Sequence, residues 1–233
     1  MPPPETPPIA HAAPDRDAIR AYLDTLFARI DAAHPPDLPT TLISGAIRCG
    51  KTRVAQRLAE ATGLVRLETD EIRNALITGL SEPDKRRVVK YVYRRLLLRF
   101  PRGVLIDGTA LMDDPCELPL WACQRGMLFF TIGYSEGTVA DKTRDLLAFR
   151  SQNRCWTHKL TDDAGVPRLA RQIIRRSKQL HAYCAAHDLP YHHLDSGQFY
   201  RERDRIATEI EGVVRAHAKD APSGLMARLK FWN

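Results

Sequence analysis

The sequence has no apolar run long enough to cross a membrane, and its cysteines offer neither a zinc site nor a disulfide framework. The five cysteines are odd in number, and no two of them form a Cys-x-x-Cys pair. The first eight residues lack both the basic region and the apolar region of a secretory signal. These absences predict a cytoplasmic protein with reduced thiols and no membrane span.

Composition restricts the class of protein much less. The 233 residues are enough for one well-buried domain with appendages, and 44% of them are hydrophobic, as in ordinary globular proteins. The formal net charge of +7 favours anionic partners. A nucleotide, an anionic substrate and a nucleic acid would all satisfy it, so charge alone does not decide the function.

The chain divides into four segments by composition and hydrophobic pattern. Residues 1–15 are rich in proline and are predicted to be disordered, because they hold too few bulky apolar residues to offset the entropy lost on ordering. In residues 16–38, an apolar stripe at helical spacing predicts a helix from about Arg16 to Ala33. Residues 39–218 form the predicted main domain, and a short C-terminal tail follows at residues 219–233.

Within the main domain, short apolar runs alternate with longer amphipathic stretches. The runs predict strands at residues 41–44, 64–69, 103–107, 127–134 and 191–194. Helices are predicted to begin near Lys51, Asp70, Glu82, Asp114, Ser135, Val166 and Gln198. Strands that alternate with helices in this way indicate an α/β fold, in which helices cover both faces of a parallel sheet.

One segment matches a phosphate-binding motif at every fixed position. The motif G-x-x-x-x-G-K-[ST] is satisfied by eight consecutive residues: Gly45, Ala46, Ile47, Arg48, Cys49, Gly50, Lys51 and Thr52. Its glycines let the loop curve tightly and direct backbone N–H groups inward, and the following helix adds its positive N-terminus. We predict that these residues, together with Arg53, bind the phosphates of a nucleoside triphosphate.

The motif also predicts the cofactors, ATP and Mg²⁺. Lys51 is expected to reach the β- and γ-phosphates, and the Thr52 hydroxyl is expected to be a ligand of Mg²⁺. The Asn-Lys-x-Asp motif of GTP-binding switch proteins does not occur. After Asp107 the chain has Gly108 where motor and AAA-type ATPases usually carry a glutamate that activates water. We expect Asp107 to hold Mg²⁺ through the water shell of the ion, with a turn-capping role as the alternative.

A second polar pair follows the strand predicted at residues 64–69. Asp70 and Arg73 form an Asp-x-x-Arg pattern, which places both side chains on one face of the first helical turn. In a phosphotransferase, the aspartate can accept the proton of the acceptor hydroxyl, and the arginine can orient the acceptor. The alternative is a helix cap followed by a surface arginine.

Together these features resemble the nucleoside-monophosphate-kinase-like branch of the P-loop kinases. Within it, the chain is most similar to the group of the polynucleotide 5′-kinase domain, the zeta-type toxins and chloramphenicol phosphotransferase. The resemblance covers about residues 39–215, and only the phosphate-binding motif is highly specific. It implies a three-layer P-loop NTPase fold with strand order 2-3-1-4-5 and a helical lid, Asp70 as the general base and Arg73 as an acceptor contact.

The resemblance also implies a lid at about residues 142–165, whose arginines would close over the phosphates. Arg150 and Arg154, one helical turn apart, are the expected contacts, and a solvated helical face is the alternative. After the last strand, the resemblance implies that one loop packs against adenine: Ser196, Gly197 and Gln198.

The sequence therefore predicts an ATP-dependent kinase with a small-molecule hydroxyl as its acceptor. A polynucleotide 5′-hydroxyl kinase is the rival that the basic residues at 85–102 favour, and a zeta-type nucleotide-sugar kinase toxin also fits the motifs. A non-catalytic ATP-dependent module is the rival from another class, and it would bind a partner through the N-terminal helix and the C-terminal tail. No pattern in the sequence indicates the acceptor or the oligomeric state.

Overall fold

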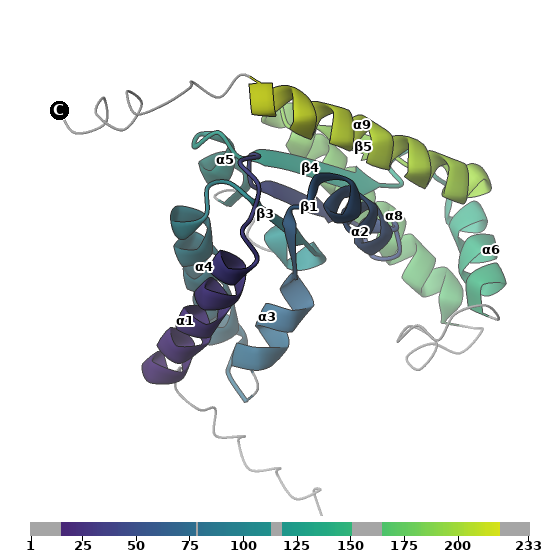
Figure 1. Ribbon diagram of the computed structural model, residues 1–233. Helices are drawn as coiled ribbons and strands as arrows, with labels where there is room; N and C mark the ends of the chain where they lie inside the picture. The colour runs from purple at the N-terminus through teal and green to yellow at the C-terminus, as the bar shows by residue number, and fades with distance from the viewer. Residues whose placement is uncertain (1–14, 78, 113–117, 151–164, 220–233) are drawn as a thin grey trace, which may run out of the picture.

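The computed structural model describes residues 15–77, 79–112, 118–150 and 165–219, which form a three-layer α/β arrangement (Figure 1). The central sheet has five strands, and every neighbouring pair is parallel. Its order is β2-β3-β1-β4-β5. The strands are β1 (Thr41–Gly45), β2 (Val65–Glu68), β3 (Val104–Asp107), β4 (Leu128–Gly133) and β5 (Tyr191–His193). The predicted fold class and strand order are confirmed.

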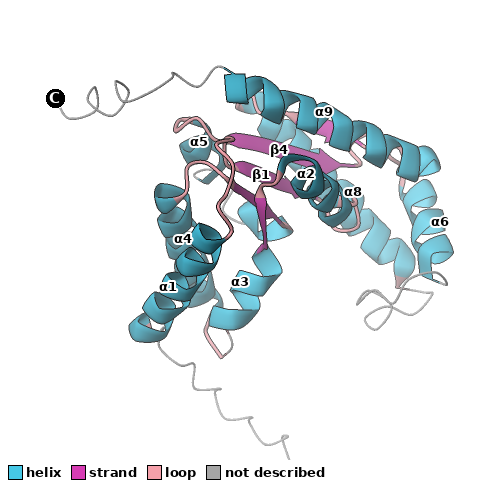
Figure 2. Ribbon diagram, in the orientation of Figure 1, coloured by secondary structure: helices cyan, strands magenta, loops and turns pink. Residues whose placement is uncertain are grey.

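Helices cover both faces of this sheet, as Figure 2 shows. Two short 3₁₀ helices are η1 (Thr109–Met112) and η2 (Ser196–Gln198). The α-helices are α1 (Arg16–Ala32), α2 (Lys51–Thr62), α3 (Thr69–Leu76), α4 (Glu82–Arg99), α5 (Leu118–Cys123), α6 (Val139–Arg150), α8 (Val166–Ala186) and α9 (Phe199–Lys219). None of the helices in these described ranges is long and apolar enough to cross a membrane.

One helix begins four residues later than the sequence predicts. The helix expected near Ser135 begins at Val139, because residues 134–137 form a turn and the Thr138 hydroxyl then accepts the amide of Asp141 at 3.0 Å as a cap. The helix expected near Asp114 would begin among residues 113–117, and the described helix that follows them is α5 at Leu118–Cys123. Asp114 itself lies outside the described residues.

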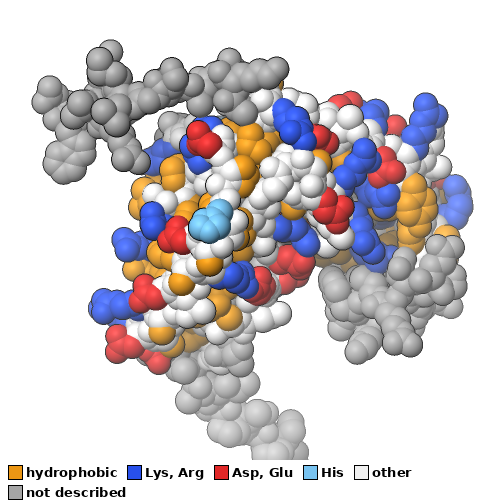
Figure 3. Space-filling model, viewed as in Figure 1, with side chains coloured by type: hydrophobic (Ala, Val, Ile, Leu, Met, Phe, Trp, Pro, Cys, Tyr) orange, Lys and Arg blue, Asp and Glu red, His pale blue; other side chains and the backbone are white. Residues whose placement is uncertain are grey.

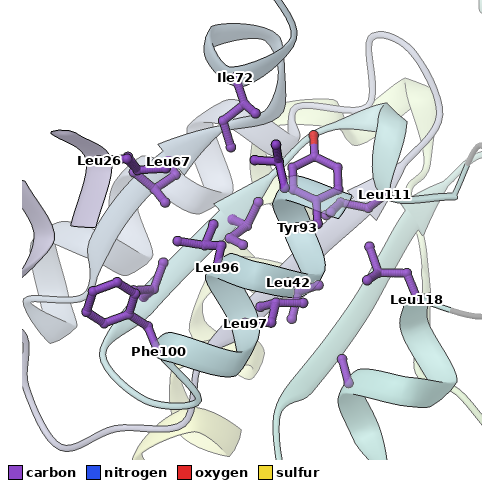
Figure 4. Packing of buried hydrophobic residues seen from close by; sticks show 14 of the residues in the cluster. Leu26, Leu42, Leu67, Ile72, Tyr93, Leu96, Leu97, Phe100, Leu111 and Leu118 are labelled. Atoms are coloured by element: carbon purple, nitrogen blue, oxygen red, sulfur yellow. The ribbon is translucent and has the colours of Figure 1, made fainter. Parts of the chain in front are cut away.

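The hydrophobic core is split into two halves by the sheet. Successive strand residues point to opposite faces, so Leu42 belongs to one half and Ile43 to the other. The first half packs β1, β2 and β3 against α1, α4 and α5, and Figure 4 shows Leu96 and Leu97 of α4 beside Leu42. The second half packs α2, α6 and α9 on the opposite face, and α8 contributes to both. Both faces are therefore covered, which matches the continuous apolar runs of the strands.

The N-terminal helix α1 is part of this core. Its N-cap, Asp15, accepts the amides of Asp17 and Ala18, and one apolar stripe is buried along its length: Ile19, Leu23, Leu26 and Ile30. Two ion pairs tie the exposed side of α1 to its neighbours. Arg29 binds Glu71 of α3 at 2.7 Å, and Asp31 binds Arg99 of α4 at 3.0 Å. Glu71 therefore faces α1, although it is the next residue after Asp70.

Candidate active site

A cleft of about 1450 Å³ opens beside the carboxyl ends of β1, β2 and β3. In open parallel sheets, ligands bind at this edge. The cleft is lined by the loop before α2, the first turns of α3 and α9, the end of β3 and one side of α6. Figure 3 shows Lys and Arg side chains gathered over the part of the molecule formed by α2, α6 and α9. We call this cavity the main cleft.

The loop between β1 and α2 has the backbone conformation that its glycines permit. A Cβ atom at Gly45 would lie 2.0 Å from the Ile132 carbonyl oxygen, so only glycine fits there. Gly50 has a φ of 79°, in the left-handed region that glycine adopts without strain. Arg48 shares this conformation with a φ of 62°. The Ala46 amide donates to Ile132 at 3.0 Å, so Gly45 and Ala46 extend the sheet and the cleft lining begins at Ile47.

The amides that follow are available for an anion. Among the described residues, no acceptor receives the N–H groups of residues 47–52, and the first helical bonds come from Arg53 and Val54 to Gly50. The Lys51 side chain is 8% exposed, and its Nζ donates to the Ala46 carbonyl at 2.7 Å. Unpaired amides beside a buried ammonium at a helix N-terminus fit a polyphosphate. Thr52 and Arg53 are exposed and line the same cleft.

Two buried side chains that the sequence reasoning missed hold this loop from behind. The Tyr134 hydroxyl donates to the Arg48 carbonyl, and Lys142 Nζ of α6 approaches the same oxygen at 3.5 Å. The ammonium also lies 3.6 Å from the centre of the Tyr134 ring, a cation–π contact. These contacts occupy the Arg48 carbonyl. We call Tyr134 and Lys142 the loop brace.

Burial makes Lys142 titrate near neutral pH. It is 2% exposed, and burial lowers the pKa of Lys142 from 10.5 to about 8, although Asp145 at 3.7 Å offsets part of the cost. Between these two pH values the unfolded chain binds a proton that the folded chain does not, so stability rises with pH. The wild type should gain up to about 3 kcal/mol relative to the Lys142→Met variant between pH 7 and 10.5.

Urea unfolding of both proteins at pH 7, 9 and 10.5 measures this difference. The variant serves as the reference because it keeps the tyrosines and cysteines that titrate in the same range. A difference in unfolding free energy that stays constant with pH would contradict the burial of a charged Lys142.

Asp107, the predicted metal residue, lies at the end of β3 and lines the cleft, but it has a partner. It is 3% exposed, and Arg66 of β2 binds both of its oxygens, at 2.9 and 3.4 Å. Arg66 also binds Glu68 at 2.7 Å. Burial raises the pKa of Asp107, and the Arg66 guanidinium acts in the opposite direction. The sequence reasoning did not find Arg66, because nothing in the sequence around a single polar strand residue indicates which distant residue it will contact.

Asp70 and Arg73 both line the main cleft from α3 and are exposed. The structure therefore brings them to the same cavity as the phosphate-binding loop. Gly108 also lines the cleft, and a Cβ atom there would lie 1.6 Å from Thr69 Oγ1, at the start of α3. The close approach of β3 to α3 thus requires glycine at the position where hydrolytic ATPases usually carry glutamate.

An aromatic cluster lines part of the cleft. Phe149 of α6 contacts Phe199 and Tyr200 of α9, with ring centres 5.3 and 5.9 Å apart. The Arg48 guanidinium lies 5.5 Å from the centre of the Phe149 ring. All four residues line the main cleft. We call Phe149, Phe199 and Tyr200 the aromatic platform.

The predicted adenine loop precedes this platform but does not line the cleft. Ser196, Gly197 and Gln198 form η2, which is capped by the Asp195 carboxylate. The cleft lining begins with the next residue, Phe199. Of the predicted lid contacts, Arg150 ends α6 and its side chain is not described, and Arg154 lies outside the described residues. Both stay predictions.

The sheet order, with a phosphate-binding loop directly after its central strand, defines a P-loop kinase fold. No protein-family model matches the chain, and no curated protein matches it in sequence. Shikimate kinase from Bacteroides thetaiotaomicron is similar with a TM-score of 0.52 and 11% identity, over 75% of this chain and 99% of that one. Shikimate kinase from Acinetobacter baumannii, solved with shikimate, is similar with a TM-score of 0.50 and 19% identity, over 77% of this chain and 94% of that one. At these identities the similarity shows the fold alone.

Proposed function

We propose that this protein is an ATP-dependent kinase that transfers the γ-phosphoryl group to a hydroxyl of a small molecule. The observation that carries the proposal is the convergence on one cleft of an open phosphate-binding loop and the carboxylate of Asp70. A carboxylate on that side can accept a proton from the acceptor, which binding of ATP alone does not need. Both similar structures are kinases by name, and the one that binds shikimate supports a small-molecule acceptor.

The donor would lie along the cleft with its phosphates on the amides of residues 47–52. Lys51 would neutralise charge on the β- and γ-phosphates, and the aromatic platform would stack on the base. The loop brace would hold the loop in shape, because Tyr134 and Lys142 both contact the Arg48 carbonyl. Base recognition would then fall to Phe149, Phe199 and Tyr200, with η2 directly before the first turn of α9.

A magnesium site fits the cleft with few protein ligands. The Thr52 hydroxyl would coordinate the ion directly, and Asp107, whose oxygens are already shared with Arg66, would bind the water shell of the ion. When bound, Mg²⁺ neutralises phosphate charge during transfer. Among the described residues no group of three or more His, Cys, Asp or Glu side chains could hold a metal, so the phosphates would supply further ligands.

In the proposed reaction, the acceptor oxygen attacks the γ-phosphorus and its proton passes to Asp70. The bond between this phosphorus and the β–γ bridging oxygen breaks, and ADP leaves with the electron pair. Arg73 would orient the acceptor, because it lies one turn after Asp70 and lines the same cleft.

The test is ATP consumption with Mg²⁺ against pooled sugars, hydroxy acids, sugar phosphates, nucleosides, antibiotics and 5′-hydroxyl oligonucleotides. Mass spectrometry then identifies a product that is heavier by one phosphate group. A product from a small-molecule pool is expected. A product from oligonucleotides alone would replace the proposal by the polynucleotide kinase, and binding of ATP without any product would replace it by the non-catalytic module.

A further inference from the structure

A second cavity of about 370 Å³ adjoins the main cleft, and the two share Arg73. Its walls come from α3, α4, η1, α5 and α8. A cavity of this size suits a small molecule rather than a polymer. Its place behind Arg73 lies on the side of α3 where the acceptor would enter, and the phosphate-binding loop does not line it. We call it the second cavity.

The described lining of this cavity is basic. No acidic residue is among its described lining. Five of the lining side chains are basic: Arg73, Lys85, Arg86, Lys90 and Arg176. They come from three different helices, so the cluster is not simply the solvent-exposed face of one helix. Arg176 donates to the Met112 carbonyl at 2.8 Å, which holds its guanidinium at the wall of the cavity.

The rest of the lining is apolar. Ile77, Val89, Leu111 and Leu118 contribute aliphatic walls, and Tyr93 adds a ring that is 1% exposed. Figure 4 shows Tyr93 of α4 beside Leu111 of η1, with Leu118 close to Leu111. Apolar walls with a few basic groups suit a carbon skeleton that carries an anionic group.

Helix α4 separates this lining from a second set of basic residues. Lys85, Arg86 and Lys90 line the second cavity, whereas Arg87 and Arg95 line a groove between α4 and α1. Adjacent arginines, Arg86 and Arg87, thus serve different surfaces. The Arg87 side chain is 77% exposed and pairs with Asp84 at 3.4 Å. This pair of neighbours gives a matched control.

We infer that the acceptor is a small hydroxylated anion, a carboxylate or a phosphate monoester, whose anionic group binds in the second cavity. Guanidinium groups bind both kinds of anion through parallel hydrogen bonds. With the anion held there, the rest of the molecule reaches past Arg73 toward Asp70, where its hydroxyl would react. The inference rests on the proposed function for the identity of the ligand as acceptor, but the binding of an anion can be tested without turnover.

The test measures binding to protein loaded with Mg²⁺ and a non-hydrolysable ATP analogue, so that the phosphate-binding loop is filled. The probes are inorganic phosphate, a pool of hydroxy acids and sugar phosphates, and two matched pairs: gluconate with gluconamide, and ribose 5-phosphate with ribose. The anionic probes should bind, and one or more of them should bind at least about tenfold more tightly than its neutral partner. The two pairs distinguish a carboxylate from a phosphate ester.

Variants of α4 then locate the binding. Arg86→Gln should weaken binding of the anion about tenfold, Arg86→Lys should weaken it less, and Arg87→Gln should leave it unchanged. Equal binding of neutral and anionic partners, equal effects of Arg86→Gln and Arg87→Gln, or no anion binding to the loaded protein would each overturn the inference.

The turnover assay separates this result from the proposed function. Anion binding that depends on Arg86, without any phosphorylated product, would leave the cavity as an anion site and reject the kinase. Phosphorylation of a neutral acceptor with the same KM in wild type and Arg86→Gln would keep the kinase and reject the anionic acceptor.

Discussion

The Lys51→Ala variant is expected to lose phosphoryl transfer almost completely, with kcat/KM lower by roughly 10³-fold, or about 4 kcal/mol. The reason is the placement of the ammonium group. Lys51 is the first residue of α2, is 8% exposed and holds its Nζ against the Ala46 carbonyl, next to the unpaired amides of the loop. Steady-state kinetics with the acceptor found in the pooled assay measure the loss, and nucleotide affinity should fall as well.

The control for this variant is Lys178→Ala. Lys178 is exposed on α8, and it lines neither the main cleft nor the second cavity. It should keep full activity, and both variants should keep the far-ultraviolet circular dichroism of the wild type. If Lys51→Ala kept more than about a tenth of the wild-type kcat/KM, the phosphate-binding role of this loop would be wrong.

The Asp70→Asn variant is expected to lose turnover by roughly 10²–10⁴-fold while binding nucleotide as tightly as the wild type. The amide cannot accept the proton of the acceptor hydroxyl. Nucleotide affinity should not change, because the phosphates are expected on residues 47–52, whereas Asp70 is expected to contact the acceptor. Turnover is measured by product formation, and nucleotide binding by calorimetry on the same preparation.

Glu71→Gln is the matched control for this second variant. Glu71 follows Asp70 directly, but its carboxylate pairs with Arg29 of α1 at 2.7 Å instead of lining the cleft. It should keep its turnover, with at most a small loss of stability, since exposed ion pairs contribute little. Full activity of Asp70→Asn would reject the general base, and a non-catalytic module would tolerate Asp70→Asn but not Lys51→Ala.

Much of the fold could be predicted from local pattern. The predicted strand at residues 127–134 contains the observed β4 at Leu128–Gly133, and the strand at 41–44 lacks only Gly45. Helix α2 begins at Lys51 and α8 at Val166, as predicted. The errors lie where turn chemistry competes with the hydrophobic period. Residues 135–138 are Ser-Glu-Gly-Thr, which form a turn and a cap, so that α6 begins only after Thr138.

The contacts of the candidate site were harder to predict when their residues lie far apart in the sequence. The residues of the phosphate-binding loop are consecutive in the sequence, and their motif directly predicts the backbone geometry. Arg66 and Asp107 stand 41 positions apart, and Lys142 binds a carbonyl 94 positions away. Each of these residues has an ordinary neighbourhood in the sequence. The adenine loop predicted at Ser196–Gln198 stays a prediction, and the cleft lining begins at the next residue, where Phe199 meets Phe149.

The sequence by itself therefore determined the parallel α/β fold, the phosphate-binding loop and the position of Asp70 and Arg73 at the start of a helix. These features depend on the hydrophobic period and on consecutive residues, so they can be predicted from a short window of the sequence. The folded structure was needed to show that Arg66 binds Asp107, that Tyr134 and Lys142 contact the loop, and that basic residues of α3, α4 and α8 surround one cavity. Those arrangements arise because packing of the two core halves brings distant segments together, and no local pattern encodes which side chains then meet.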